Sequence, residues 1–535
     1  MPDQILYLKM DAQQQQKDFV KILLDNNVIV NKDILRTINQ VKNFPTFYDV
    51  FNRSLETGEI NIDNSNIIDI ISIVNQKAGV ISPEPLIKSA EAGEIKKETP
   101  DTPRDPDPSR KSVSSVNIIN SYDGEPKKRE VQDFVSLFNK RYDALKNLLI
   151  NRKELNSPTS ISRAANKTDK EEAVIIGMIL ERNITKNGHV IMTLEDPTGT
   201  IKVLINKNKP EMLEIAKDCG YDEVVGVTGP ARDNMLFANN LLLPDIPLTK
   251  ELKKAPDEVY AAFIGDMHFG SKVFLHEEWQ KFLKWIKEES GNEEQKELAR
   301  KVKYIFIAGD LVEGVGIYPG QENDLEITDI HEQYQTFAAH LKQIPSDKHL
   351  IICPGNHDAM RIAEPQPPLY KDFAAAIYEL PNVQMVSNPA IINIHKSEGF
   401  PGIDVLLYHG FSYIYYADQV ESIRAAGGQK RVDLIMKYLL QRRHLAPAHK
   451  STLYLPDADK DNLLIDQVPD IFVSGHIHRA GVFNYRNIQM IAGSCWLKTT
   501  EYQEKMGLQP QPARVPLINL KTRKARILKF ASEET

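Results

Sequence analysis

The chain of 535 residues is poor in cysteine, in excess charge of one sign and in long apolar runs. Its three cysteines, Cys219, Cys353 and Cys495, lie far apart and form no CxxC pair, which excludes a disulfide framework and predicts a reducing compartment. The net charge of -7 gives the chain as a whole no attraction for nucleic acid or membranes. No apolar run reaches the roughly 18 residues of a transmembrane helix, and the N-terminus, MPDQILYLKMDAQQQQ, lacks a signal-peptide core. We therefore expect a soluble, cytoplasmic protein with no membrane partner.

The chain is longer than one hydrophobic core usually organises, and its composition changes along the sequence. Residues 1–75 contain helically spaced apolar residues, as in KDFVKILLDNNVIVNKDILRTI, which predicts a small helical domain. Residues 76–128 are rich in Pro, Ser, Lys and Glu and poor in large apolar side chains, which predicts a flexible linker. Residues 129–165 contain the amphipathic helix VQDFVSLFNKRYDALKNLLINR and form a helical lead-in to the next domain.

Residues 166–250 are rich in predicted strands. The segments AVIIGMILERN, HVIMTLEDPTG and IKVLINKN predict strands, and the helix PEMLEIAKDCG and two further strand segments follow. This order is typical of a five-stranded OB barrel, and TLEDPTGTIKVLI resembles OB-fold nucleic-acid-binding domains. Barrels that hold single strands usually offer several aromatic faces, whereas this segment offers Phe237, Tyr221 and little else. Both DNA contact and a structural or docking role remain open for this domain.

Residues 257–535 alternate short apolar runs with amphipathic helices, which predicts an α/β domain. Five of these runs, YAAFIG, KYIFIAG, HLIICPG, DVLLYHG and DIFVSG, end next to polar side chains. In chain order, those side chains are Asp266 and His268, Asp310, Asn356 with His357 and Asp358, His409, and His476 with His478. Because ligands bind outside the carboxyl ends of strands in α/β sheets, we expect these residues to converge on one crevice.

The chemistry of this set points to metal ions. The set consists of two Asp, one Asn and four His. The absence of a thiolate disfavours a structural zinc site. Imidazole and carboxylate ligands suit Mn, Fe or Zn in a catalytic centre. Seven candidate ligands are too many for one ion and fit two ions about 3.5–4 Å apart that share a carboxylate. We expect Gly475 to let the backbone turn tightly, so that His476 and His478 each face one ion. Six histidines that fit no motif are predicted to be structural: His331, His340, His349, His395, His444 and His449.

The ordered motifs GDMH (265–268), AGDLVEG (308–314), PGNHDAMR (354–361), YHG (408–410) and SGHIH (474–478) resemble those of the calcineurin-like metallophosphoesterases. The resemblance implies one ion held by Asp266, His268 and His478, a second held by Asn356, His409 and His476, and Asp310 bridging the two. It also implies that a metal-bound hydroxide attacks the phosphate and that His357 protonates or stabilises the leaving oxygen. Asp358 is then expected to orient His357 by a hydrogen bond.

An OB barrel before a calcineurin-like domain, together with the loop GIYPGQ (316–321), resembles the small subunits of archaeal family-D DNA polymerases, over about residues 130–535. It also resembles the related B subunits of eukaryotic replicative polymerases, which are non-catalytic scaffolds. The resemblance implies a 3′–5′ proofreading exonuclease that acts on DNA 3′ ends, uses two divalent ions (Mn²⁺ first, Fe or Zn as alternatives) and works with a large polymerase subunit. The alternatives are a silent scaffold subunit, which the filled ligand positions disfavour, and a free-standing metallophosphodiesterase, which the barrel and loop disfavour. The basic segment 427–450 is expected near the site, either as a substrate-facing cap or as a structural element.

Overall fold

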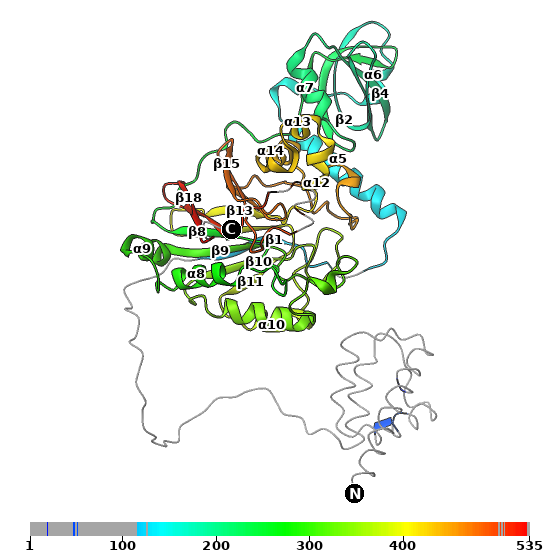
Figure 1. The fold of residues 1–535 in the computed structure, drawn as a ribbon. Helices are drawn as coiled ribbons and strands as arrows, with labels where there is room; N and C mark the ends of the chain where they lie inside the picture. Colours follow the sequence, from blue (N-terminus) through cyan, green and yellow to red (C-terminus); the bar gives the residue numbers. More distant parts are fainter. Residues whose placement is uncertain are drawn as a thin grey trace, which may run out of the picture. The chain divides into compact units, whose positions relative to one another are not determined.

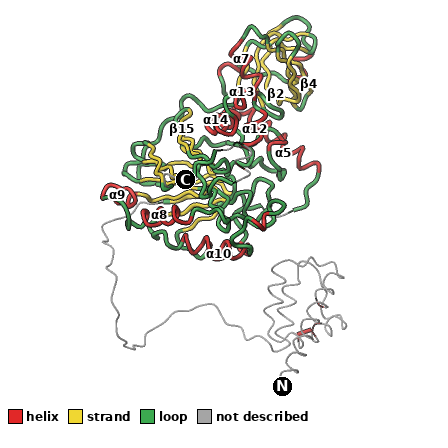
Figure 2. Tube along the Cα trace, in the orientation of Figure 1, coloured by secondary structure: helices red, strands yellow, loops and turns green. Residues whose placement is uncertain are grey.

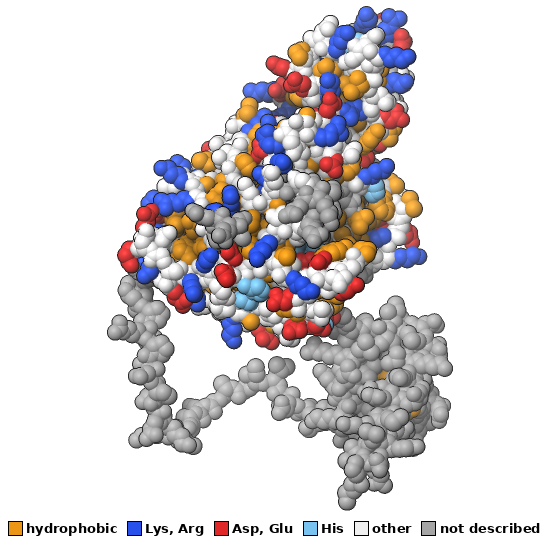
Figure 3. Space-filling model, in the orientation of Figure 1, with side chains coloured by type: hydrophobic (Ala, Val, Ile, Leu, Met, Phe, Trp, Pro, Cys, Tyr) orange, Lys and Arg blue, Asp and Glu red, His pale blue; other side chains and the backbone are white. Residues whose placement is uncertain are grey.

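The computed structural model describes residues 115–124, 127–500 and 509–531, together with Phe19, Phe47, Tyr48, Phe51, Gln503 and Gly507. The chain forms two compact units, Met1–Pro106 and Asp107–Thr535. Within the described part, no helix combines the length and the apolar character that a membrane span requires. The three cysteines are buried free thiols, as expected from their spacing. On the face shown in Figure 3, basic and acidic side chains are interspersed, which agrees with the small net charge.

Only four residues of the first unit are described. Phe19, Phe47 and Phe51 lie in helices and are buried, and the ring centroids of Phe19 and Phe51 are 4.6 Å apart. The rest of the helical domain predicted over 1–75, and residues 76–114 of the predicted linker, lie outside the described residues.

Two six-stranded sheets form the centre of the second unit (Figure 1). Across the first sheet the strands are β1 (Val116–Ser121), β12 (Ala390–Ile394), β13 (Ile403–Leu407), β14 (Ile471–Ser474), β16 (Ile488–Ala492) and β15 (Gly481–Tyr485). Across the second sheet they are β11 (Val383–Met385), β10 (His349–Cys353), β9 (Val302–Ala308), β8 (Tyr260–Ile264), β17 (Arg514–Asn519) and β18 (Ala525–Lys529). Strands β8, β9 and β10 are parallel, as are β13 and β14, so the carboxyl ends within each group lie at one edge of their sheet.

The two sheets pack face to face because their strands are apolar on both sides. In β8, Ala261 and Phe263 enter the core between the sheets, and Tyr260, Ala262 and Ile264 enter the core on the opposite face. This alternation follows from the two-residue period of a strand. A strand covered on both faces is a continuous apolar run, which explains why YAAFIG is recognisable in the sequence.

Helices cover the outer face of each sheet (Figures 1 and 2). The outer face of the second sheet packs against α8 (His276–Ile286), α9 (Glu293–Lys301), α10 (Ile330–Leu341) and α11 (Lys371–Tyr378). The outer face of the first sheet packs against α12 (Tyr413–Gln419), α13 (Glu421–Ala425) and α14 (Val432–Arg442). The result is a four-layer α/β/β/α sandwich, which confirms the α/β architecture predicted for this part of the chain.

An OB-like barrel precedes the sandwich. Its strands are β2 (Glu171–Ile184), β3 (Val190–Asp196), β4 (Gly199–Ile205), β6 (Met235–Phe237), β5 (Val224–Arg232) and β7 (Asn240–Leu242), and α7 (Pro210–Asp218) follows β4. Because β2 pairs with both β3 and β5, strands β2, β3, β4, β6 and β5 close a five-membered ring, and β7 adds to its edge. The predicted five-strand order is therefore present, with the last segment split into β6 and β7. The domain limits 166–250 and 257–535 stay predictions from the sequence.

Buried ion pairs fasten the barrel and the helical lead-in to the sandwich. In the lead-in, α5 (Val131–Leu149) carries Arg141, whose Nε lies 2.7 Å from a carboxylate oxygen of Asp461, and both side chains are buried. On the barrel, Glu223 pairs with Arg442 of α14 at 3.1 Å. Arg443 donates to the carbonyl of Ile465. These two arginines of the basic segment 427–450 are thus structural, which favours the structural alternative for that segment.

The prediction of a flexible linker over residues 76–128 is wrong for residues 116–121. These residues form β1, which pairs antiparallel with β12 at the edge of the first sheet. The strand continues into further contacts, since the amide of Tyr122 donates to Ser387 Oγ at 2.7 Å. The average composition of 76–128 predicts a linker, but the short run VNIINS contains three β-branched residues, which favour a strand, and its backbone pairs with a sheet edge.

Candidate metal centre

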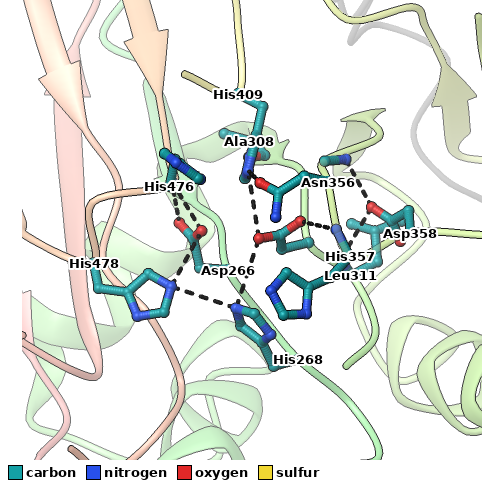
Figure 4. Close-up of polar contacts among 12 residues, drawn as sticks. Asp266, His268, Ala308, Leu311, Asn356, His357, Asp358, His409, His476 and His478 are labelled. Atoms are coloured by element: carbon teal, nitrogen blue, oxygen red, sulfur yellow. Dashed lines mark hydrogen bonds and ion pairs between the residues drawn. The ribbon is translucent and has the colours of Figure 1, made fainter. Parts of the chain in front are cut away.

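All the predicted site residues follow the carboxyl ends of strands from both sheets, and Figure 4 shows that the labelled ones lie close together. Asp266 and His268 follow β8, Asp310 follows β9, Asn356, His357 and Asp358 follow β10, His409 follows β13, and His476 and His478 follow β14. The sandwich brings these two groups of strand ends together, and the side chains of nine residues from five strand ends lie within one neighbourhood.

Three clusters of ligand atoms lie in this crevice. They are Asp266 with His268 and His478, His268 with Asp310 and His357, and Asp310 with His409 and His476, and within each cluster the ligand atoms lie within 4.8 Å of one another. Asp310 belongs to two of the clusters. Buried His and Asp clusters of this kind are consistent with a dinuclear metal site.

On one side, two imidazoles and a carboxylate face a common point. His268 Nε2 and His478 Nε2 are 3.4 Å apart, and His478 Nε2 is 3.5 Å from an Asp266 oxygen. His268 Nε2 is also 3.8 Å from an Asp310 oxygen. Three nitrogen and oxygen donors turned toward each other at these distances suit a cation between them.

On the other side, His409 Nε2 is 3.4 Å from an Asp310 oxygen and 2.9 Å from the Asn356 amide oxygen. His476 Nε2 is buried and has no hydrogen-bond partner among the described residues. Buried polar atoms are nearly always paired in folded proteins. This orphaned nitrogen therefore supports the fit between the residues present and a bound metal ion.

The opposite ring nitrogens of three candidate ligands are held by the protein. His268 Nδ1 lies 3.0 Å from Glu313 Oε2, His409 Nδ1 lies 2.7 Å from the Ala308 carbonyl oxygen, and His478 Nδ1 lies 3.1 Å from Gln503 Nε2. For His268 and His409, an acceptor at Nδ1 fixes the ring and leaves Nε2 available to a metal. Reasoning from the sequence misses Glu313, although it lies in the motif AGDLVEG.

The backbone around the ligands is strained. Asp266, His268, Asp310, His476 and His478 all have φ between 49° and 70°, in the left-handed region that non-glycine residues seldom occupy. Such conformations persist where the surrounding structure enforces them, and they concentrate at functional sites.

The glycines beside the ligands supply space. A Cβ on Gly475 would lie 2.7 Å from an Asp266 carboxylate oxygen, and one on Gly355 would lie 2.3 Å from an Asp310 oxygen. Neither glycine is among the residues with positive φ. The expectation that Gly475 provides a special backbone turn is therefore wrong, because its role is close approach to Asp266.

Burial and neighbouring charges shift the pKa values of several groups in the site. Burial would raise the pKa of Asp310, but the nearby His409 and His357 hold it well below its usual value. Burial lowers the pKa of His476 to about 3, so that its imidazole stays neutral, as a metal ligand must be. Burial also opposes protonation of His409, but Asp310 outweighs it and raises the pKa of His409 to about 9.

His357 lies at the edge of the cluster. Its backbone amide donates to Asp310 Oδ1 at 2.8 Å, and its Nδ1 lies 2.8 Å from the Glu313 carbonyl oxygen. Its ring centroid is 4.7 Å from that of His268, and its side chain is 18% exposed. The ring is therefore anchored beside the clusters and still open to solvent.

The expected hydrogen bond from Asp358 to His357 is not formed. The buried carboxylate of Asp358 instead accepts hydrogen bonds from the amide of Gly355 at 2.8 Å, from the amide of Leu311 at 3.3 Å and from the hydroxyl of Tyr334 at 3.0 Å. Burial, with the Asp310 charge, raises the pKa of Asp358 to about 7. Asp358 therefore holds together the loops after β9 and β10, and the carbonyl of Glu313 orients the ring of His357 instead.

Several of the histidines predicted to be structural have partners elsewhere. His340 accepts from Trp279, His395 contacts the hydroxyl of Tyr304, and His444 pairs with Asp461. None of these three belongs to a metal cluster of the described residues.

Comparison with known proteins identifies the family. Residues 261–481 match the family of the DNA polymerase alpha/epsilon B subunit. The DNA polymerase II small subunit of Methanothermobacter thermautotrophicus is 38% identical over 391 residues, which cover 73% of this chain and 78% of that protein. The protein of the same name from Archaeoglobus fulgidus is 38% identical over 406 residues, covering 76% of this chain and 78% of that protein.

Among solved structures, a novel archaeal phosphodiesterase is 9% identical, covers 50% of this chain and 99% of its own, and has a TM-score of 0.25. The sequence relationships are much stronger, since each extends over more than two thirds of both chains. The protein belongs to the family of DNA polymerase II (family D) small subunits.

Proposed function

We propose that this chain is the 3′–5′ proofreading exonuclease subunit of a heteromeric replicative DNA polymerase and hydrolyses DNA phosphodiesters at a dinuclear metal centre. The observation that carries the proposal is the complete set of ligand side chains, with Asp310 shared by two clusters. A scaffold without turnover gains nothing from gathering these polar groups, because unpaired polar atoms in a crevice cost stability.

The family relationship supports the choice of partner and substrate. The relatives are named as small subunits of a DNA polymerase. By extension, the proposed partner of this chain is a large catalytic polymerase subunit, and the proposed substrate is a DNA 3′ end that has left the polymerase site.

Each ion has a proposed set of protein ligands. Asp266, His268 and His478 would hold one ion, Asn356, His409 and His476 would hold the other, and Asp310 would contact both. Imidazole, amide and carboxylate donors suit Mn²⁺, our first candidate, as well as Fe or Zn. Bound divalent ions supply Lewis acidity, which polarises phosphate oxygens and makes water more acidic.

His357 is the proposed general acid. With Nδ1 donating to the Glu313 carbonyl, the imidazolium form carries its second proton on Nε2. As water adds to phosphorus and the bond to the 3′ oxygen breaks, that proton can pass to the leaving oxygen. The products are a nucleoside 5′-monophosphate and a primer with a new 3′-hydroxyl, which a polymerase can extend.

The test uses the purified full chain, Mn²⁺ and a 5′-labelled primer with a mismatched 3′ end, first alone and then with the large subunit. We expect stepwise shortening that requires Mn²⁺. His357→Ala should slow it about 10²- to 10⁴-fold, the usual contribution of a positioned acid. His331→Ala is the matched control, because His331 is exposed and lies outside the metal clusters.

The outcomes separate the alternatives. Shortening only in the presence of the large subunit supports an exonuclease that assembly activates. No shortening in either case, with Mn²⁺ shown to be bound, contradicts the exonuclease and leaves the silent scaffold. Cleavage of a nitrophenyl diester without any cleavage of DNA would instead support a free-standing phosphodiesterase.

A further inference from the structure

Exposed apolar side chains stand on the loop that follows the second site motif. Val315 is 48% exposed, Ile317 is 39% exposed and Tyr318 is 40% exposed. Single exposed apolar side chains are common on protein surfaces, whereas several close together mark a binding surface. We call these three residues the apolar ledge.

The ledge begins at the proposed general acid. The Glu313 carbonyl that anchors His357 Nδ1 lies directly before this loop. Gly314 has a φ of 78°, and a Cβ there would lie 2.4 Å from the His357 carbonyl oxygen and 2.9 Å from Ile317 Cδ1. The side chain of Ile317 and the backbone of His357 therefore flank the same glycine.

Two buried glutamines hold the ledge in place. Gln321 accepts from the amide of Ile317 at 2.9 Å and donates to the Glu313 carbonyl at 3.1 Å. Gln333, on α10, accepts from the amide of Gly314 at 2.9 Å and donates to its carbonyl at 3.2 Å. A preformed loop loses little conformational entropy when it binds, which suits a recognition surface.

The ring of Tyr318 is also oriented. Its hydroxyl donates to Asp324 at 2.9 Å, which fixes the polar end of the side chain and leaves the ring partly open to solvent. An aromatic face in such a setting can stack on any base, because all four bases have a flat π-face.

We propose that the apolar ledge receives the unpaired base at the DNA 3′ end and that Tyr318 stacks on it. This inference rests on the proposed function and assigns the feature of the substrate that is recognised. A paired terminal base is stacked in the duplex, whereas an unpaired base can turn out and offer its face. A protein partner covering a surface that begins at His357 would obstruct access to the site, so a nucleobase is the occupant we favour.

The test compares two 5′-labelled single-stranded oligonucleotides that differ only at the 3′ terminus, one ending in thymidine and one in an abasic tetrahydrofuran residue. Binding is measured by fluorescence anisotropy with Ca²⁺, on the full chain carrying His357→Ala to prevent cleavage. With Tyr318 present, we expect loss of the base to weaken binding about 5- to 150-fold, the range for stacking of one base on an aromatic ring. Tyr318→Ala should bind both oligonucleotides equally.

Two further variants exclude a general effect on folding. Tyr318→Phe removes the hydroxyl bond to Asp324 and keeps the ring, so it should retain the preference for the terminal base. Tyr221→Ala removes a tyrosine that is 54% exposed on the barrel and should also retain it. An unchanged base preference in Tyr318→Ala overturns the proposal, and weaker association of that variant with the large polymerase chain would then assign the ledge to the partner.

The proposal and the proposed function can fail separately. If the chain with Tyr318 and His357 intact shortens primers but Tyr318→Ala keeps its base preference, stacking is wrong and the exonuclease stands. If that chain never cleaves DNA but the base preference depends on Tyr318, the exonuclease is wrong and the binding surface stands.

Discussion

Replacing Glu313 by glutamine should weaken metal binding while leaving the fold intact. Glu313 Oε2 lies 3.0 Å from His268 Nδ1, and its side chain is 6% exposed. Burial would raise the pKa of Glu313, but the hydrogen bond with His268 lowers it below its usual value, so the group is an anion at neutral pH. The anion makes the opposite nitrogen of His268 a stronger donor to a cation. Glutamine keeps an oxygen acceptor and loses the charge, and such changes cost about 10- to 100-fold in metal affinity, or about 1.4–2.8 kcal/mol.

Calorimetric titration of the metal-free full chain with Mn²⁺ measures this affinity directly. Glu278→Gln is the matched control, because Glu278 is a buried glutamate on α8 that belongs to none of the metal clusters. Excess Mn²⁺ should restore cleavage by Glu313→Gln, since the backbone carbonyl that anchors His357 is unchanged. Affinities for both ions within about twofold of the unmodified chain would refute the reasoning, because they lie well outside the expected 10- to 100-fold range.

Three further predictions follow from the site and the core. His476→Ala should reduce the Mn²⁺ content from two ions per chain to one, measured by elemental analysis after desalting, and two retained ions would contradict its role as a ligand. Gly355→Ala, whose Cβ would lie 2.3 Å from an Asp310 oxygen, should abolish tight Mn²⁺ binding, whereas Gly265→Ala, with its nearest neighbour at 3.4 Å, should preserve it. Burial lowers the pKa of His444 from 6.5 to about 4. The folded protein therefore favours the neutral imidazole. The resulting contribution to the free energy of unfolding is present above pH 6.5 and is lost as the pH falls toward 4. Urea unfolding should show a loss of about 2 kcal/mol from this residue at pH 5, and His444→Gln should lack that part of the pH dependence.

The strands and the convergence of the candidate ligands were predictable for one physical reason. A strand covered on both faces is a short apolar run, and the residue after its last apolar position reaches the edge of the sheet. Ile264, Ala308 and Cys353 end such runs, so the polar residues that follow them are expected at one edge. The resemblance of five ordered motifs then supplies roles that spacing alone leaves open.

The interactions that complete the site were not predictable in the same way. Asp358 accepts from Tyr334, a residue of α10 that no local pattern connects to it. Glu313 contacts His268 across two loops, and its proximity depends on how those loops fold over the strand ends. The predicted pairing of Asp358 with His357 rests on sequence adjacency, which does not determine where a side chain points.

The second error of the sequence-based prediction concerns strand pairing. The average composition of residues 76–128 predicts a linker and hides the strand-favouring run VNIINS at 116–121, which forms backbone hydrogen bonds to β12. Whether a sheet edge is open to such a strand depends on the tertiary structure and is absent from the local sequence.

The most direct test of the dinuclear exonuclease measures bound Mn²⁺ and the release of the 3′-terminal nucleotide in one titration of the full chain with its large subunit. The terminal nucleotide of a mismatched primer carries the label, and Mn²⁺ is added stepwise to metal-free protein. We predict that release of the labelled 5′-monophosphate rises as the second equivalent of Mn²⁺ binds, and that His357→Ala binds both equivalents but releases the label far more slowly. Two bound equivalents without release from the unmodified chain, or release that does not depend on Mn²⁺, would contradict the proposed function.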